Sequence, residues 1–115
     1  RIQSIGGFVT EKGRVMGDLA VTRSLGDCSS HPYVTNKPHL YEGDLTPNDE
    51  FLILACDGLW DEIEDDEAVE LVKQWPPEQA AIMLRDYAFL LGSADNISVI
   101  VVFFKCDGTL VVSQT

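Results

Sequence analysis

The sequence predicts an α+β fold, in which helices pack on one face of a mostly antiparallel sheet. Two apolar runs rich in β-branched residues, at 51–56 and 97–104, are typical of central strands buried on both faces. Two amphipathic stretches, at 66–75 and 78–91, lie between these runs and predict a pair of neighbouring helices. Shorter extended segments are expected on both sides of this block, so the strands cluster toward the two ends of the chain.

The first part of the chain predicts a hairpin and then a loop. Residues 8–10 and 14–16 are extended in pattern, and Gly13 suits the positive-φ position of the turn between them. The composition from 27 to 37 is typical of a loop, and a short strand is expected at 39–42. The turn at 46–49 then leads into the strand at 51–56.

The two helices have recognisable boundaries. Acidic residues in the first turn of 66–75 complement the helix dipole, and Pro76-Pro77 ends this helix and starts the next. Gly92 is expected to cap the second helix at its C-terminus. A last strand is expected at 110–112.

Composition limits the classes of function. The 115 residues fit one domain, 1–115, and the net charge of −11 excludes a nucleic-acid surface, which needs a basic footprint. No apolar stretch approaches the length of a membrane span. Three widely spaced cysteines without a CxxC pair favour a reducing compartment, so we expect a cytoplasmic or nuclear protein.

Two carboxylates at the ends of the long strands are the candidate functional residues. Asp57 follows the run 51–56, and Asp95 precedes the run 97–104. If these strands are neighbours, both carboxylates lie at one edge of one sheet, where a hard divalent cation can share them. The alternative interpretation of Asp57 is an ordinary turn residue, because aspartate before glycine is common where a strand ends.

Three motifs of this chain, in this order, resemble the C-terminal part of the metal-dependent protein phosphatase family (PP2C, or PPM). They are Gly6-Gly7-Phe8-Val9 with the segment 14–27, then Phe51 to Asp61 with its Asp57-Gly58-Leu59-Trp60-Asp61, then Gly92-Ser93-Ala94-Asp95-Asn96 with the strand after it. The resemblance covers nearly the whole chain and less than half of the family's catalytic domain. It implies a partial α/β/β/α sandwich of mostly antiparallel sheets flanked by helices.

The resemblance also implies a chemistry and the residues that serve it. A complete domain binds two Mn²⁺ or Mg²⁺ ions, and a metal-activated water hydrolyses phosphoserine and phosphothreonine in protein substrates. Asp57 and Asp95 match metal ligands of the family, and Asp61 matches a residue of the outer sphere or of a third metal site. Arg14 and Arg23 are candidates for contact with the substrate phosphate.

The family's bridging aspartate lies in an upstream D-G-H-x-G motif that this sequence does not contain. We therefore interpret the chain, which begins at Arg1, as a piece of a longer protein that is inactive when isolated. Such a piece supplies only part of each sheet. The uncovered apolar face and edges are expected to make it self-associate.

Two other functions compete with this one. A pseudophosphatase of the same fold, which binds partners after losing metal residues upstream, differs from the enzyme only outside this sequence. A small acidic interaction module unrelated to catalysis leaves the paired strand-end aspartates unexplained.

Overall fold

The computed structural model describes all residues, 1–115, which form two compact units, Arg1–Gly43 and Asp44–Thr115. We describe each unit by itself. None of the helices is long and apolar enough to cross a membrane.

The first unit is built mostly from turns around a small core of Ile2, Val15 and Val34. The predicted hairpin is confirmed in its shortest form, because Val9 and Val15 form an antiparallel bridge and Gly13 has a φ of 74°. Two 3₁₀ turns, Gln3–Ile5 and Cys28–Ser30, complete the regular structure of this unit. The strand expected at 39–42 is wrong: the segment pairs with no other strand, and Tyr41 is 88% exposed.

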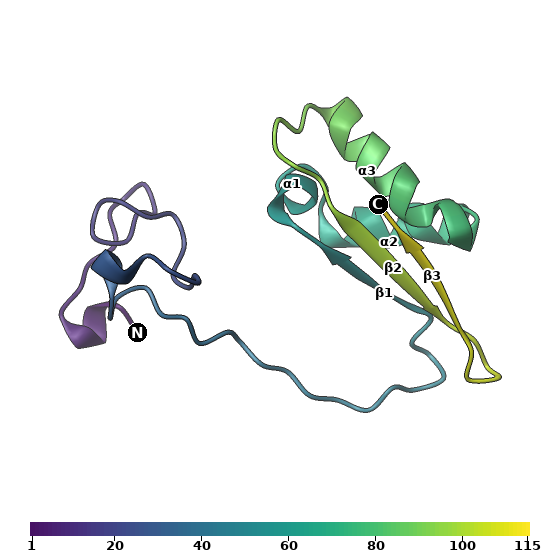
Figure 1. Ribbon diagram of the computed structural model, residues 1–115, viewed down its shortest axis with the longest axis horizontal. Helices are drawn as coiled ribbons and strands as arrows, with labels where there is room; N and C mark the ends of the chain where they lie inside the picture. The colour runs from purple at the N-terminus through teal and green to yellow at the C-terminus, as the bar shows by residue number, and fades with distance from the viewer. The chain divides into compact units, whose positions relative to one another are not determined.

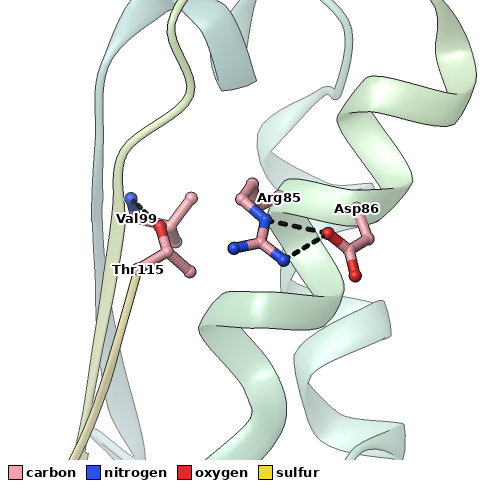
Figure 2. Close-up of polar contacts among 4 residues, drawn as sticks. All are labelled: Arg85, Asp86, Val99 and Thr115. Carbon is pink, nitrogen blue, oxygen red and sulfur yellow. Dashed lines mark hydrogen bonds and ion pairs between the residues drawn. The ribbon is translucent and has the colours of Figure 1, made fainter.

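The second unit contains a three-stranded antiparallel sheet in the order β1 (Phe51–Ala55), β2 (Val99–Phe104) and β3 (Leu110–Gln114) (Figure 1). Ala55 pairs with Val99 at one end of the sheet. The predicted strands therefore exist, although β2 begins two residues later than expected and β3 extends two residues further. The β2–β3 pairing continues to the last residue, since Val99 N–H donates to Thr115 Oγ1 at 3.2 Å (Figure 2).

Three helices pack on one face of this sheet, and the apolar faces of α2 and α3 explain why (Figure 1). They are α1 (Asp57–Trp60), α2 (Asp65–Gln74) and α3 (Ala80–Leu91). A 3₁₀ turn at Pro77–Gln79 delays the start of α3 relative to the predicted residue 78, and Gly92 caps α3 as expected, with a φ of 112°. The core beneath them consists of buried side chains such as Leu59, Leu84, Val99 and Val101.

A hydrogen bond joins the two longer helices at their exposed side. The Tyr87 hydroxyl donates to Glu67 Oε1 at 2.9 Å, and this bond raises the pKa of Tyr87. Residues of α2 and α3 are thus held together by polar as well as apolar contacts.

The opposite face of the sheet is apolar and open. It is formed by alternate residues of the three strands, including the polar Gln114 opposite Ile100. We call its seven apolar residues the open sheet face: Leu52, Leu54, Ile100, Val102, Phe104, Leu110 and Val112. The expectation that both long strands are buried on both faces is therefore wrong for this chain, since Leu52 and Leu54 are 46% and 49% exposed. The reason is that all three helices of the second unit pack on the same face.

Candidate metal-binding site

The segments that carry Asp57 and Asp95 meet at one edge of the sheet. Because β1 and β2 are antiparallel and Ala55 pairs with Val99, the end of β1 adjoins the start of β2. The pairing continues one residue beyond the strands, where Cys56 N–H donates to the Ser98 carbonyl at 3.2 Å. The predicted adjacency of the two strands is confirmed. That the two carboxylates share one ion stays a prediction.

Asp57 is the first residue of α1 rather than the last residue of a strand. Its Oδ1 accepts a hydrogen bond from Gly58 N–H at 3.1 Å, and its carbonyl accepts from Asp61 N–H at 2.8 Å. The spacing of four residues places Asp57 and Asp61 on the same side of this single turn. Trp60 fixes the turn to the sheet, because its indole Nε1–H donates to the Ala55 carbonyl at 3.1 Å.

Asp95 lies in the loop between α3 and β2, which has no regular structure. Its Oδ1 accepts a hydrogen bond from Asn96 N–H at 2.6 Å. A shallow cleft of about 450 Å³ brings Asp95 and Asp61 together, and it is lined by Gly58, Asp61, Glu62, Ser93, Ala94 and Asp95. Asp57 is exposed beside this cleft and is not part of its lining.

No ion pair of this chain involves these carboxylates. The ion pairs of the chain are Lys73–Glu70 and Arg85–Asp86. Arg85 lines a neighbouring depression with Asp95, but its Nε and one terminal nitrogen donate to Asp86 Oδ1 at 2.8 and 2.6 Å (Figure 2). The edge that carries Asp57, Asp61 and Asp95 therefore has a negative electrostatic potential, which attracts cations from solution.

The donor set fits a hard divalent cation only in part. Carboxylate oxygens are the ligands that Mg²⁺ and Mn²⁺ prefer. However, no group of three or more acidic, histidine or cysteine side chains is arranged to hold a metal ion. These residues can supply part of a coordination sphere, and other ligands have to complete it.

Arg14 and Arg23 both belong to the first unit, whereas the three aspartates belong to the second. The Arg14 guanidinium donates to the Asp18 carbonyl at 2.8 Å, within the predicted hairpin and the turn after it. Arg23 forms a parallel bridge with Thr35, and both arginines are exposed. Their predicted contact with a phosphate stays a prediction.

Sequence reasoning missed the residues that hold this edge together. The buried Ser93 hydroxyl donates to the Gly58 carbonyl at 2.8 Å. Gly58 itself is required by packing, because a Cβ there would lie far inside van der Waals contact with the Asn96 carbonyl oxygen. The position of Ser93 two residues before Asp95 was visible in the sequence, but its partner lies 35 residues away and no local pattern indicates it.

Comparison with known proteins assigns the family. The sequence model of the family described as Protein phosphatase 2C matches residues 1–97. Protein phosphatase 2C homolog 1 of Saccharomyces cerevisiae is 48% identical over 104 residues, which cover 90% of this chain and 37% of the yeast protein. Probable protein phosphatase 2C 59 of Arabidopsis thaliana is 46% identical over 110 residues, covering 93% of this chain and 35% of the plant protein.

A solved structure agrees with these relatives. The structure titled "Structure of a C.elegans sex determining protein" superposes with a TM-score of 0.77 at 32% identity, covering 90% of this chain and 28% of that one. The chain thus spans about a third of the length of these relatives. With a family model matched over 97 residues and a shared fold, the chain belongs to the protein phosphatase 2C family.

Proposed function

We propose that this chain is the C-terminal part of the catalytic domain of a protein serine/threonine phosphatase that depends on Mn²⁺ or Mg²⁺. The observation that carries the proposal is the uncompensated set of aspartates at one sheet edge, on the motifs that match the family's metal ligands. Membership of the family supports phosphate hydrolysis in general. Serine/threonine specificity and the dependence on Mn²⁺ or Mg²⁺ go beyond that finding and are proposed for this protein.

Each aspartate has a distinct role in this proposal. Asp57 and Asp95 would supply ligands to the same ion, and Asp61 would act in the outer sphere or at a weaker third site. Bound Mn²⁺ or Mg²⁺ supplies a nucleophilic water near neutral pH and neutralises the phosphate charge. Arg14 and Arg23 orient the substrate phosphate. The remaining ligands, including a bridging carboxylate, come from residues outside this chain.

The open sheet face indicates how the complete domain is built. A second sheet outside this chain covers the open sheet face and gives the full sandwich, which agrees with the partial coverage of the relatives. We also propose a cytoplasmic or nuclear location, because the three cysteines are widely spaced and include no CxxC pair.

A pseudophosphatase of this fold is the second candidate. The incomplete ligand set of this chain is compatible with both candidates, because the remaining ligands of an enzyme lie outside it. The two candidates differ in the metal dependence of hydrolysis by the complete protein.

We expect the complete protein to hydrolyse p-nitrophenyl phosphate and a phosphothreonine peptide with Mn²⁺ or Mg²⁺, and to stop in excess chelator. The physical reason is that neutral water at pH 7 is too weak a nucleophile without a metal. The isolated 115-residue chain, assayed in parallel, is expected to be inactive because its ligand set is incomplete. Undiminished hydrolysis in chelator contradicts the metal mechanism, and no hydrolysis under any metal condition favours the pseudophosphatase.

A further inference from the structure

Four hydrogen bonds fasten the loop that carries Asp95 to the segment that carries Asp57. Two of them join Cys56 and Ser98. Cys56 N–H donates to the Ser98 carbonyl at 3.2 Å, and Ser98 N–H donates to Cys56 Sγ at 3.3 Å. The same thiol donates to the Asn96 carbonyl at 3.0 Å. The fourth runs from the Ser93 hydroxyl to the Gly58 carbonyl at 2.8 Å. The four bonds bracket Asp95 on both sides.

Ser93 differs from the other members of this set. It is 9% exposed and is one of two buried polar residues in the chain, and its bond is the only one of the four on the N-terminal side of Asp95. The loop from Gly92 to Ser98 has no helix or strand of its own. Without the Ser93 bond, the half of the loop before Asp95 loses its polar attachment to the turn that presents Asp57 and Asp61.

We propose that Ser93 is a positioning residue for the divalent cation: it holds the Asp95 loop at the distance from α1 at which both segments bind one ion. This inference rests on the proposed function. The physical basis is pre-organisation, because residues that hydrogen-bond behind the ligands typically change metal affinity by about 10- to 100-fold when they are removed. If the loop has to become ordered when the ion binds, the loss of conformational entropy makes the binding free energy less favourable.

Ser113 provides a matched control. It is the other buried polar residue, 3% exposed, and its hydroxyl also bridges two segments, accepting from Ala81 N–H at 3.1 Å and donating to the Glu78 carbonyl at 3.0 Å. Ser113 contacts the first turn of α3, whereas Ser93 follows the last turn of the same 12-residue helix. Removing the Ser93 hydroxyl deletes one hydrogen bond and removing the Ser113 hydroxyl deletes two, but only Ser93 adjoins the candidate metal ligands.

The experiment compares Ser93→Ala with Ser113→Ala in the complete protein. Mn²⁺ affinity is measured by titration calorimetry, and the unfolding midpoint is measured in chelator. We expect both variants to unfold more easily, since each loses a buried hydrogen bond. Only Ser93→Ala is expected to bind Mn²⁺ more weakly, by about tenfold, and its kcat is expected to recover at saturating Mn²⁺.

If Ser93→Ala does not fold, Ser93→Cys keeps a similar volume with a weaker donor, and we expect it to weaken Mn²⁺ binding to a smaller extent. Unchanged Mn²⁺ affinity in the folded Ser93 variant overturns the inference while leaving the proposed function intact. Equal weakening by Ser113→Ala also overturns it, because the effect then follows general stability. An unsubstituted protein that binds no Mn²⁺ overturns the proposed function and this inference together.

Discussion

If the proposed function is correct, Asp95→Asn and Asp57→Asn are each expected to lower kcat of the complete protein by about two orders of magnitude or more. Asparagine keeps the size of the side chain and an oxygen that can accept the Gly58 or Asn96 N–H bond of the native residue. What it removes is one negative charge at an edge where no lysine or arginine of this chain forms an ion pair with it. The loss should therefore appear in catalysis and metal affinity, with little change in the unfolding midpoint.

Asp44→Asn is the control for this experiment. Asp44 is an exposed carboxylate outside every helix and strand, so the substitution changes net charge equally without touching the candidate site. We expect Asp44→Asn to retain the original kcat, measured by release of p-nitrophenol at saturating Mn²⁺. Unchanged rates for both Asp57→Asn and Asp95→Asn under these conditions contradict the assignment of these residues as metal ligands.

The isolated chain is expected to form a dimer or a larger assembly through the open sheet face. Five of its seven side chains are at least 36% exposed: Leu52, Leu54, Ile100, Leu110 and Val112. None of the seven carries a charge, and covering such a patch removes apolar surface from water at about 25 cal/mol per Å². A second copy provides the same flat, uncharged face, and two-fold packing closes both surfaces at once.

Leu54→Glu tests this self-association by sedimentation at micromolar concentration. A charge at the centre of the open sheet face is costly to bury, so the variant is expected to sediment as a folded monomer. Leu90→Glu is the matched control, because Leu90 is 80% exposed on α3, the helix on the other side of the sheet. We expect Leu90→Glu to self-associate like the original chain. A stable monomer of the unsubstituted chain shows that this face needs no partner.

The sequence predicted the elements that position the site. The apolar runs before Asp57 and after Asp95 specified two strands, and their antiparallel pairing brings both carboxylates to one edge. The amphipathic stretches specified α2 and α3 to within two residues. These features are encoded locally, by the period of the apolar residues and by Pro and Gly at the boundaries.

Other features depend on contacts that no local pattern encodes. The run at 51–56 is equally apolar on both sides, so by itself it predicts burial on both faces; the exposure of Leu52 and Leu54 was expected only from the resemblance to part of a larger domain. The hydrogen bond from Ser93 to Gly58 and the contact between Gly58 and Asn96 join residues from opposite ends of the α-helical block. The prediction of a short strand at 39–42 failed because a local pattern does not show whether a partner strand is present, and an extended segment without one forms no sheet.

The most direct test of the central claim is to locate Mn²⁺ on the chain itself. In a titration of the isotopically labelled chain with substoichiometric Mn²⁺, paramagnetic broadening of amide NMR signals identifies the nearest residues. The competing location is the acidic first turn of α2, Asp65–Glu67. We expect the signals of residues 57–61 and 93–96 to broaden together and first, since one ion is held between the two segments. Broadening centred on 65–67, with the signals of 93–96 still sharp, would show that Asp57 and Asp95 do not form a metal site.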